Sequence, residues 1–205
     1  QPQIHMPTTG TAPYGVVILL HGAGGTGGGM ISQWSNVITD QILVAPTGYN
    51  NVWNIIDESD APDYDVLEEL IEKCVQYTNV DATKIRFLGI SNGGAMALRM
   101  GMEYSVPNRV DIICSIISQC HDEQYRGAPG WFKPSNHENT DSTNTNAGYD
   151  TSYTPNINPT TVPHRYFLCM NTVNDNVIPY NGGTVLAVGT TFLSAPNSAY
   201  RIAQA

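Results

Sequence analysis

The sequence predicts an α/β protein with a mostly parallel, doubly wound sheet, and three observations support this fold class. Short runs of β-branched and aliphatic residues end in glycine or proline, which is typical of strands buried on both faces. Segments with apolar residues at helical spacing lie between these runs, and the alternation favours parallel strands joined by right-handed crossovers. The 205 residues, 41% of them hydrophobic, suit a single domain with a sizeable core.

The first half of the chain supplies three predicted strands and one helix. Residues 16–20 (VVILL) and 41–45 (QILVA) are the first two strands, because the first is a continuous apolar run and the second is apolar after Gln41 and stops at Pro46. A helix is predicted over residues 66–74, with Asp63 at its start and acidic residues in its first turn that complement the helix dipole. Residues 84–90 then form a strand that runs directly into a serine.

The second half continues the alternation of strands and helices. Residues 93–104 have the composition of a helix, and residues 109–118 and 166–170 have the composition of strands. The residues from 194 to 205 look helical. Strands and helices that alternate at this spacing extend the same parallel sheet.

Residues 121–163 break the rhythm, because they have almost no apolar periodicity and are rich in Asn, Thr, Ser, Pro, Gly and Tyr. A segment of about 40 residues without regular structure is too long for an ordinary connection. Two interpretations stay open: a surface excursion, or a lid-like insertion over a site. The aromatic residues that such a cap would bind with are Tyr125, Trp131, Phe132, Tyr149 and Tyr153.

Charge and composition exclude several classes of function. Nine Lys and Arg against eighteen Asp and Glu give a formal net charge of −9, which repels nucleic acid and anionic membrane surfaces. The longest apolar runs fall far short of the roughly 20 residues of a membrane-spanning helix. Charged residues make up only 13% of the chain, and the uncharged polar residues that replace them favour a secreted or periplasmic protein.

The cysteines predict neither a metal site nor a fixed disulfide pattern. Cys74, Cys114, Cys120 and Cys169 lack the spacing of metal ligands, and three of them lie in apolar contexts where a free Cys behaves as a small hydrophobe. Structural thiols are the favoured interpretation, while a bridge that involves Cys114 or Cys120 stays open. The sequence predicts no metal and no organic cofactor.

A nucleophile motif lies where the strand over 84–90 meets the following helix. Residues 89–94 (GISNGG) match G-x-S-x-G, which places Ser91 in a sharp strand-to-helix turn. Such a turn strains the serine backbone and leaves its hydroxyl at a helix N-terminus, where negative charge is stabilised. A chance match in a glycine-rich chain is the alternative, but the strand and helix on either side favour a catalytic serine.

A glycine-rich turn, residues 21–25 (HGAGG), follows the first strong strand. Loops that follow neighbouring parallel strands reach the same edge of the sheet, so this turn is expected beside Ser91. The backbone N–H groups of Ala23 and Asn92 are our candidates for an oxyanion hole. His21 is expected to hold the turn. Nucleotide binding is disfavoured, because the sequence has neither G-x-G-x-x-G leading into a helix nor a P-loop lysine.

A candidate acid lies beyond the strand predicted over 166–170. Asp175 sits in an Asn-rich turn, where a carboxylate can orient an imidazole. The chain order of serine before aspartate is that of α/β-hydrolases. Aspartate is also common in turns for purely local reasons, so Asp175 gains weight only together with Ser91.

Three segments together resemble a known family. Residues 20–25 (LHGAGG), 80–97 (VDATKIRFLGISNGGAMA) and 175–183 (DNVIPYNGG) look like the α/β-hydrolase group of poly(3-hydroxybutyrate) depolymerases, feruloyl esterases and acetylxylan esterases, the carbohydrate esterase family 1 type. The similarity spans nearly the whole chain, and the pairing of S-N-G-G with D-x-x-I-P-Y-x-G-G is fairly specific. Residues 171–172 (NT) depart from the His-Gly that the family usually has before the acid, which affects only local turn geometry.

The resemblance implies an α/β-hydrolase fold with Ser91 as nucleophile and Asp175 as triad acid. It also implies that the loop around Trp53 lies near the substrate cleft. We therefore predict substrate contacts for Trp53 and, from the neighbouring turn, for His21 and Gly22.

The general base is missing from its expected place. The resemblance places it after Asp175, yet none of the residues 176–205 is His. We therefore expect the last strand, the histidine loop and the final helix to lie beyond Ala205. His121 is a substitute candidate, because it follows the end of a strand next to the nucleophile's own, although a structural or substrate-contacting role is the alternative. The remaining histidines have no such context: His5, His137 and His164.

The sequence thus predicts a serine ester hydrolase that works through an acyl-enzyme. By resemblance, its substrates are feruloyl or acetyl esters on polysaccharide, or polyesters. The expected partner is this ester substrate, with no nucleic acid and no membrane, and the oligomeric state is left open. The alternative from another class is a catalytically silent ligand- or carbohydrate-binding relic without a base. A thioesterase or dienelactone-type hydrolase would share the machinery.

Overall fold

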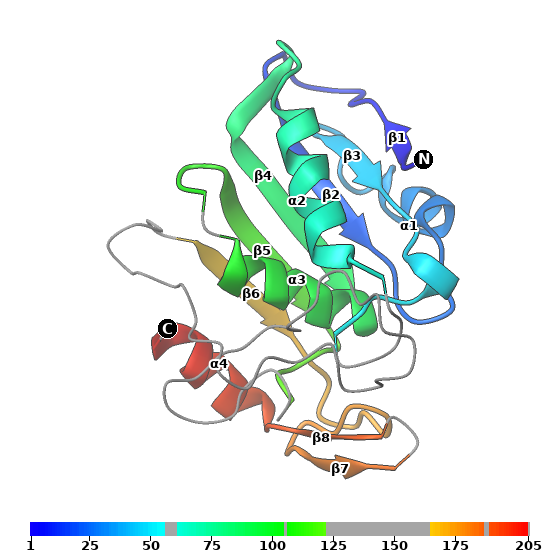
Figure 1. Ribbon diagram of the computed structural model, residues 1–205, viewed down its shortest axis with the longest axis vertical. Helices are drawn as coiled ribbons and strands as arrows, with labels where there is room; N and C mark the ends of the chain where they lie inside the picture. The colour runs from blue at the N-terminus through cyan, green and yellow to red at the C-terminus, as the bar shows by residue number, and fades with distance from the viewer. Residues whose placement is uncertain (56–60, 105, 122–164, 187–188, 205) are drawn as a thin grey trace.

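The computed structural model describes residues 1–55, 61–104, 106–121, 165–186 and 189–204. Its centre is a six-stranded sheet in the order β1-β3-β2-β4-β5-β6, and a second, two-stranded sheet is formed by β7 and β8 (Figure 1). Neighbouring strands of the large sheet pair in parallel except β1, which runs antiparallel to β3 at one edge. The mostly parallel α/β architecture predicted from the sequence is confirmed.

The strands of the large sheet follow the apolar runs of the sequence. They are β1 Gln3–His5, β2 Tyr14–Leu20, β3 Ile42–Ala45, β4 Val80–Ile90, β5 Val110–Ile116 and β6 Tyr166–Met170. β6 has the predicted bounds, whereas β4 begins earlier than predicted and β5 ends two residues before Ser118. The short edge strand β1 was not among the predicted strands.

Four helices among the described residues accompany the sheet. They are α1 Gly27–Trp34, α2 Asp63–Cys74, α3 Asn92–Glu103 and α4 Ala195–Gln204. The last three were predicted. Besides β1, the elements that the sequence did not predict are α1, the short 3₁₀ turn η1 Tyr49–Asn51, and the hairpin of β7 Gly183–Val185 with β8 Thr190–Phe192.

The helices cover both faces of the sheet. On one face α2 and α3 bury Leu67 and Met96 in the same cluster as Ile18 of β2. On the other face α1 buries Met30 in a cluster with Leu19, the next residue of that strand. Because successive side chains of a strand point to opposite faces, β2 must be apolar at every position. The doubly wound arrangement therefore explains the unbroken apolar run.

α1 begins inside the glycine-dense stretch where the sequence predicts only a turn. The Thr26 hydroxyl accepts a hydrogen bond of 3.1 Å from the Gly29 N–H and caps the first turn of the helix. Met30 and Trp34, one turn apart, then pack on the sheet. Packing against the sheet thus stabilises this helix. The sequence does not predict it, because glycine has a poor helix propensity.

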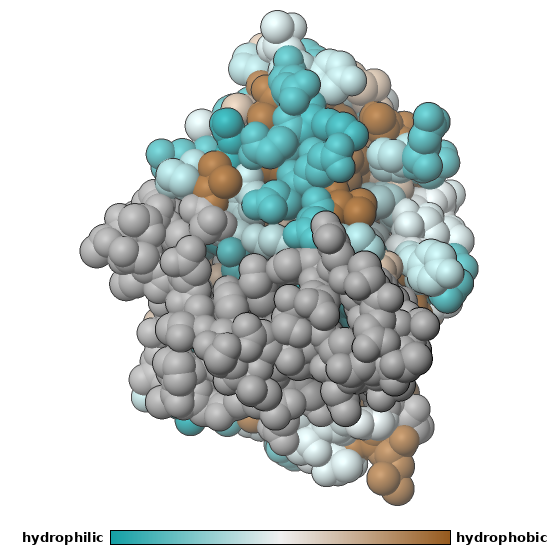
Figure 2. Space-filling view, viewed as in Figure 1, coloured by the Kyte–Doolittle hydropathy of each residue, from teal (hydrophilic) through white to brown (hydrophobic). Residues whose placement is uncertain are grey.

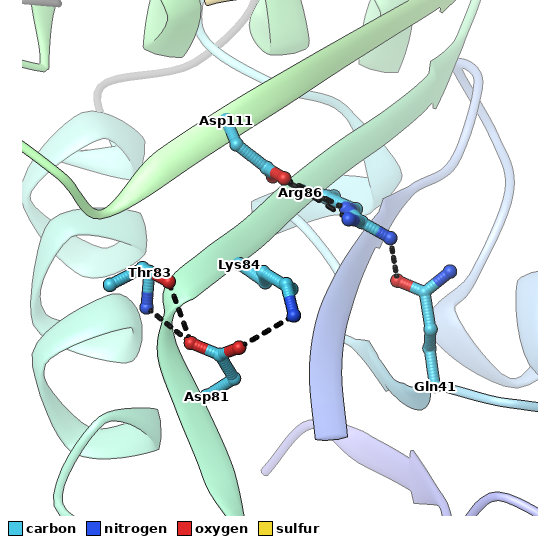
Figure 3. Close-up of polar contacts among 6 residues, drawn as sticks. All are labelled: Gln41, Asp81, Thr83, Lys84, Arg86 and Asp111. Atoms are coloured by element: carbon cyan, nitrogen blue, oxygen red, sulfur yellow. Dashed lines mark hydrogen bonds and ion pairs between the residues drawn. The ribbon is translucent and has the colours of Figure 1, made fainter. Parts of the chain in front are cut away.

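A polar cluster links β4, β5 and the entry to β3 on the surface of the sheet (Figure 3). The Arg86 guanidinium donates to both carboxylate oxygens of Asp111 at 3.1 to 3.2 Å and to Oε1 of Gln41 at 2.8 Å. Near the start of β4, Asp81 pairs with Lys84 at 2.8 Å. These contacts link neighbouring parts of the sheet. None of the residues that make them was predicted to take part in catalysis or substrate binding.

The residues that follow β5 fasten the C-terminal part of the chain to the sheet. The side chain of Gln119 donates to the Pro179 carbonyl at 2.6 Å. The Cys120 N–H donates to the Ser198 hydroxyl at 3.1 Å, and the Cys120 carbonyl accepts from the Leu193 N–H at 2.8 Å. The end of β5 therefore holds both the loop that follows β6 and the helix α4.

The four cysteines are free, so the bridge that the sequence left open is not formed. Burial raises the pKa of all four thiols, namely those of Cys74, Cys114, Cys120 and Cys169. A thiol with a raised pKa stays protonated near neutral pH and is a poor nucleophile. Their role is therefore that of small buried side chains.

The surface over α2 is mainly hydrophilic (Figure 2). Glu69 and Lys73 form an exposed ion pair of 2.7 Å on this helix. Within the described ranges, no helix combines the length and apolar character that crossing a membrane requires. The insertion predicted over 121–163 lies outside the described residues apart from His121.

Candidate active site

The serine predicted as nucleophile lies in a strained turn between β4 and α3. Ser91 has φ 54° and ψ −120°, in the positive-φ half of the map that residues with a side chain rarely adopt. Its N–H donates to the Ile116 carbonyl at 2.9 Å, and its carbonyl accepts from the Ala95 N–H at 3.0 Å. The sheet and the helix thus hold this backbone from both sides, in the strand–turn–helix geometry of a nucleophile elbow.

Two glycines allow the turn to be this tight. A Cβ on Gly89 would lie 2.0 Å from the Gly93 carbonyl oxygen, and a Cβ on Gly93 would lie 2.3 Å from the Leu20 carbonyl oxygen. β4 and α3 therefore touch backbone to backbone, and α3 starts directly against the end of β2. This contact brings the serine and the turn after β2 to the same place on the sheet edge.

The Ser91 side chain lies at the start of α3. The residue is partly exposed, and within the part of the chain that the structure describes its hydroxyl makes no hydrogen bond. α3 begins at the next residue, and the first N–H groups of a helix carry the positive end of its dipole. An oxyanion that forms beside Ser91 is therefore electrostatically favoured.

The turn after β2 lies against the serine. A Cβ on Gly22 would be 3.5 Å from the Ser91 Cβ, so the two backbones are close neighbours. The Gly24 N–H in this turn already makes a hydrogen bond, because it donates to the Asn51 carbonyl at 2.8 Å. Ala23 is exposed, and its N–H makes no hydrogen bond to any described residue. The Ala23 N–H therefore stays a candidate oxyanion donor, in a turn whose Gly22 lies next to Ser91.

His21 is enclosed by the protein. Its Nδ1–H donates to the Gly22 carbonyl at 2.8 Å and its Nε2 accepts from the Gly48 N–H at 3.0 Å, which fixes the neutral tautomer. The side chain is only 2% exposed. Both ring nitrogens are occupied within the fold, so these contacts serve to hold the turn and leave no ring nitrogen for the substrate contact that we predicted.

Burial lowers the pKa of His21, and the hydrogen bond to Gly22 opposes this only in part. The unfolded chain therefore binds a proton at His21 more readily than the folded protein does. As the pH falls through about 6.5, the stability that neutral His21 contributes is progressively lost. We expect the free energy of unfolding, from urea titrations at pH 7.5 and 5.5, to fall more in the wild type than in His21→Gln.

The matched control for this prediction is His5→Gln, which removes a histidine from the edge strand β1. This variant should lose as much stability between the two pH values as the wild type does. An equal acid-induced loss in the wild type and in His21→Gln would contradict the role assigned to the buried imidazole.

The loop around Trp53 reaches the site, but the indole belongs to the core. Trp53 is 1% exposed, its Nε1–H donates to the His21 carbonyl at 2.9 Å, and the two rings lie 5.1 Å apart. The indole therefore has almost no surface for the substrate contact that we predicted. On the same loop Tyr49 is 63% exposed. No motif or periodicity marks Tyr49 in the sequence.

The predicted acid is held in a defined orientation. Oδ1 of Asp175 accepts hydrogen bonds from the Val177 N–H at 2.7 Å and from the Ile178 N–H at 2.8 Å. Its second oxygen makes no hydrogen bond to the described residues. The loop follows β6, whose end lies beside the end of β5, since the Ile117 N–H donates to the Met170 carbonyl at 2.7 Å. Asp175 therefore projects from the same edge of the sheet as the serine turn.

His121 is deeply buried at this edge. It is 3% exposed, forms an isolated antiparallel bridge with Phe192, and packs edge-on against that ring at 6.0 Å. Within the described residues, no hydrogen bond joins His121 to Ser91 or to Asp175. These contacts fit a residue that helps to dock β8. They do not bring an imidazole to the nucleophile.

The site therefore combines a strained serine, two candidate oxyanion donors and an oriented carboxylate at the carboxyl edge of a parallel sheet. This is chemistry for acyl transfer by a serine nucleophile. Among the described residues, no group of three or more His, Cys, Asp or Glu side chains is placed to hold a metal ion. The sheet topology and the serine turn between β4 and α3 are those of an α/β-hydrolase.

No protein-family model and no curated protein sequence matches the chain. Similar solved structures include esterase PE8 at 22% identity and TM-score 0.43, and the Bacillus cereus carboxylesterase at 17% and 0.47. A third is a 2,6-dihydroxy-pseudo-oxynicotine hydrolase at 20% and 0.46. The alignments cover 56%, 58% and 58% of this chain and 62%, 60% and 33% of those chains, respectively. The chain thus spans less than two thirds of each of these esterases and hydrolases.

Proposed function

We propose that the chain carries the nucleophile, the oxyanion hole and the acid of a serine-dependent ester hydrolase that works through an acyl-enzyme. The observation that carries this proposal is the strained backbone of Ser91 with the Ala23 turn beside it. Strain of this kind costs of order 1–3 kcal/mol and persists where the surrounding structure imposes it, which is typical of catalytic turns.

In the acylation step, Ser91 Oγ attacks the carbonyl carbon of the ester. The electron pair of the C=O bond moves to its oxygen, where the N–H groups of Ala23 and Asn92 stabilise the negative charge. Each such donor is worth about 3 kcal/mol in the transition state. When the intermediate collapses, the C–O bond to the alcohol breaks, and the alcohol leaves with the proton that came from the serine.

The proton is carried by an imidazole that the second oxygen of Asp175 orients. The two backbone bonds at Oδ1 fix the carboxylate, which leaves Oδ2 to accept from a ring N–H. Water then attacks the acyl carbon and gives its proton to the same imidazole. The bond between the acyl carbon and Ser91 Oγ breaks, the imidazole returns the proton to Oγ, and the acid leaves. In this scheme His121 keeps its buried structural position.

The substrate class that we propose is an acyl ester on polysaccharide, feruloyl or acetyl, or an ester link of a polyester. The resemblance of the S-N-G-G and D-x-x-I-P-Y-x-G-G segments supports this class. Tyr49 adds a second support, because its exposed ring lies on the loop whose Asn51 contacts the oxyanion turn. An exposed aromatic ring suits a sugar face, a cinnamoyl group or an aromatic polyester.

A second candidate function is a ligand-binding protein that has kept the hydrolase framework without its activity. It is favoured by one observation, namely that no described residue makes a hydrogen bond to the Ser91 hydroxyl. A serine without a base is a weak nucleophile, and such a site would bind esters without turning them over.

A fluorophosphonate probe separates the two functions, because it forms a covalent bond only with an activated serine. We expect the folded protein to be labelled at Ser91, with the modified peptide located by mass spectrometry. Ser91→Ala should remain unlabelled, and Ser32, an exposed serine in α1 whose hydroxyl bonds the Gly28 carbonyl, should carry no label in either protein. A folded wild type that stays unmodified at Ser91 would favour the binding protein.

A further inference from the structure

The loop between β3 and α2 contacts both halves of the proposed oxyanion hole. We call residues 48–53 of this loop the brace. It lies between the turn that carries Ala23 and the start of α3, where Asn92 follows the nucleophile. Hydrogen bonds between described residues hold both ends of the brace.

One end of the brace holds the Ala23 turn through Asn51. The Asn51 carbonyl accepts from the Gly24 N–H at 2.8 Å, and its side-chain amide donates to the Gly25 carbonyl at 2.7 Å. The turn is also closed on itself by a 2.9 Å bond from the Gly25 N–H to the Gly22 carbonyl. Both peptide groups that follow Ala23 are thus fixed, and the direction of the Ala23 N–H is fixed with them.

The other end of the brace is held by the side chain of Asn92. Its Oδ1 accepts from the Trp53 N–H at 2.6 Å and its Nδ2 donates to the Trp53 carbonyl at 2.9 Å. The amide thus pairs with both polar groups of one backbone residue, as a neighbouring strand would. The same residue supplies the second oxyanion donor from its backbone, so its side chain ties this donor to the brace.

Further contacts make the brace rigid. The Gly48 N–H and the Trp53 indole N–H both donate to His21, at the ring and at the carbonyl. Just beyond the brace, the Arg99 guanidinium of α3 donates to the Asn54 carbonyl at 2.8 Å and pairs with Glu103 at 3.2 Å, with both charged side chains 4% exposed. Breaking a buried ion pair is strongly destabilising, so this anchor is not easily released.

The backbone of the brace is shaped for Asn51. Both Asn50 and Asn51 have positive φ values, 51° and 62°. Asparagine tolerates this left-handed conformation better than other residues with a side chain. In this conformation the Asn51 carbonyl and side-chain amide both bond to the Ala23 turn.

We infer that Asn51 and Asn92 are positioning residues of the oxyanion hole, which set the distance and direction between the Ala23 and Asn92 N–H groups through the brace. This inference rests on the proposed function. Oxyanion donors act on charge that develops only in the transition state, so a displaced donor lowers the rate of the chemical step more than it weakens binding of the ester. Displacements of about 1 Å are enough for a hundredfold loss of rate.

The test uses Asn51→Gly, which keeps the left-handed backbone and the Gly24 bond but removes the amide that holds Gly25. For p-nitrophenyl acetate we expect kcat to fall by about tenfold to a hundredfold while KM changes less than about threefold. Asn51→Asp keeps the side-chain size and the positive φ but replaces the donor by an oxygen, and should lose as much. Asn92→Asp, which keeps the bond to the Trp53 N–H but not the one to its carbonyl, should also lower kcat.

Asn108→Gly is the matched control, because Asn108 is an exposed asparagine with φ 56° in the turn before β5. It should keep wild-type kcat and KM, while its thermal midpoint reports the cost of the same substitution elsewhere. A purely structural role for Asn51 would lower the midpoint of Asn51→Gly and leave kcat unchanged.

The outcomes separate the inference from the proposed function. Wild-type kcat in both Asn51 variants and in Asn92→Asp, with Ser91 still labelled by fluorophosphonate, would overturn the inference alone. A wild type that neither hydrolyses the ester nor takes the label would overturn the proposed function, and the positioning role would fall with it. A drop in kcat at near-constant KM, absent in Asn108→Gly, would support it.

Discussion

Replacing Ser91 by glycine is expected to abolish ester hydrolysis and, at the same time, to stabilise the protein. The loss in kcat/KM should reach about 10⁴-fold or more, because the nucleophile of the acyl-enzyme is gone. The gain in stability follows from φ 54° at this position, where glycine has no Cβ to strain. Relief of 1–3 kcal/mol of strain, less the entropy that glycine loses on folding, leaves about 1 kcal/mol.

Ser91→Ala is the comparison that isolates the strain. It removes the same hydroxyl, so hydrolysis of p-nitrophenyl acetate should fall as far, but it keeps a Cβ and should leave the free energy of unfolding in urea unchanged. Equal stability of the alanine and glycine variants would show that the backbone at Ser91 is not strained. The assignment of Ser91 as nucleophile would then lose the observation on which it rests. Retained turnover in either variant would refute the serine mechanism.

The second large effect is expected at Gly93, where α3 meets the end of β2. In Gly93→Ala the new Cβ would lie 2.3 Å from the Leu20 carbonyl oxygen and 2.4 Å from that of His21. Both atoms belong to the backbone, so the helix must move away from the strand. We expect a loss of about 3 kcal/mol or more in the free energy of unfolding, together with loss of activity, because the same contact aligns Ser91 with the Ala23 turn.

Gly28→Ala in α1 makes the same substitution where there is room. A Cβ there meets only the Thr26 hydroxyl oxygen, at 4.0 Å. Alanine is the better helix former, so this variant should be as stable as the wild type or up to about 0.5 kcal/mol more stable. Equal effects of the two substitutions on urea unfolding would show that helix propensity, and not the close approach at Gly93, decides the result.

The sequence predicts best those elements whose signal is local. β6 and the serine turn are readable because an apolar run, or a run of glycines around a serine, acts over a few residues. α1 is hidden for the opposite reason. Its glycines argue against a helix, and only the Thr26 cap and the packing of Met30 on the sheet form it. The hairpin of β7 and β8 has strands of three residues, too short for a periodic pattern.

The site follows the same division. Ser91 and Asp175 are predicted from motifs. The burial of Trp53 is not, because the sequence alone does not distinguish a buried aromatic residue of a loop from one that contacts substrate. The role that we infer for Asn51 has no local signal at all. Its partners Gly24 and Gly25 lie a β-strand and a helix away in the chain, and the sequence alone does not show such pairings.

The fastening of the C-terminal part by Gln119 and Cys120 has a consequence for how the site assembles. The serine turn forms between β4 and α3, which are consecutive in the chain. The acid loop and α4, by contrast, are held by bonds that span 60 and 78 residues. Closing such long loops is entropically costly and comes late in folding. The proposed esterase activity would therefore report the final docking step, after the sheet and its strained serine have already formed.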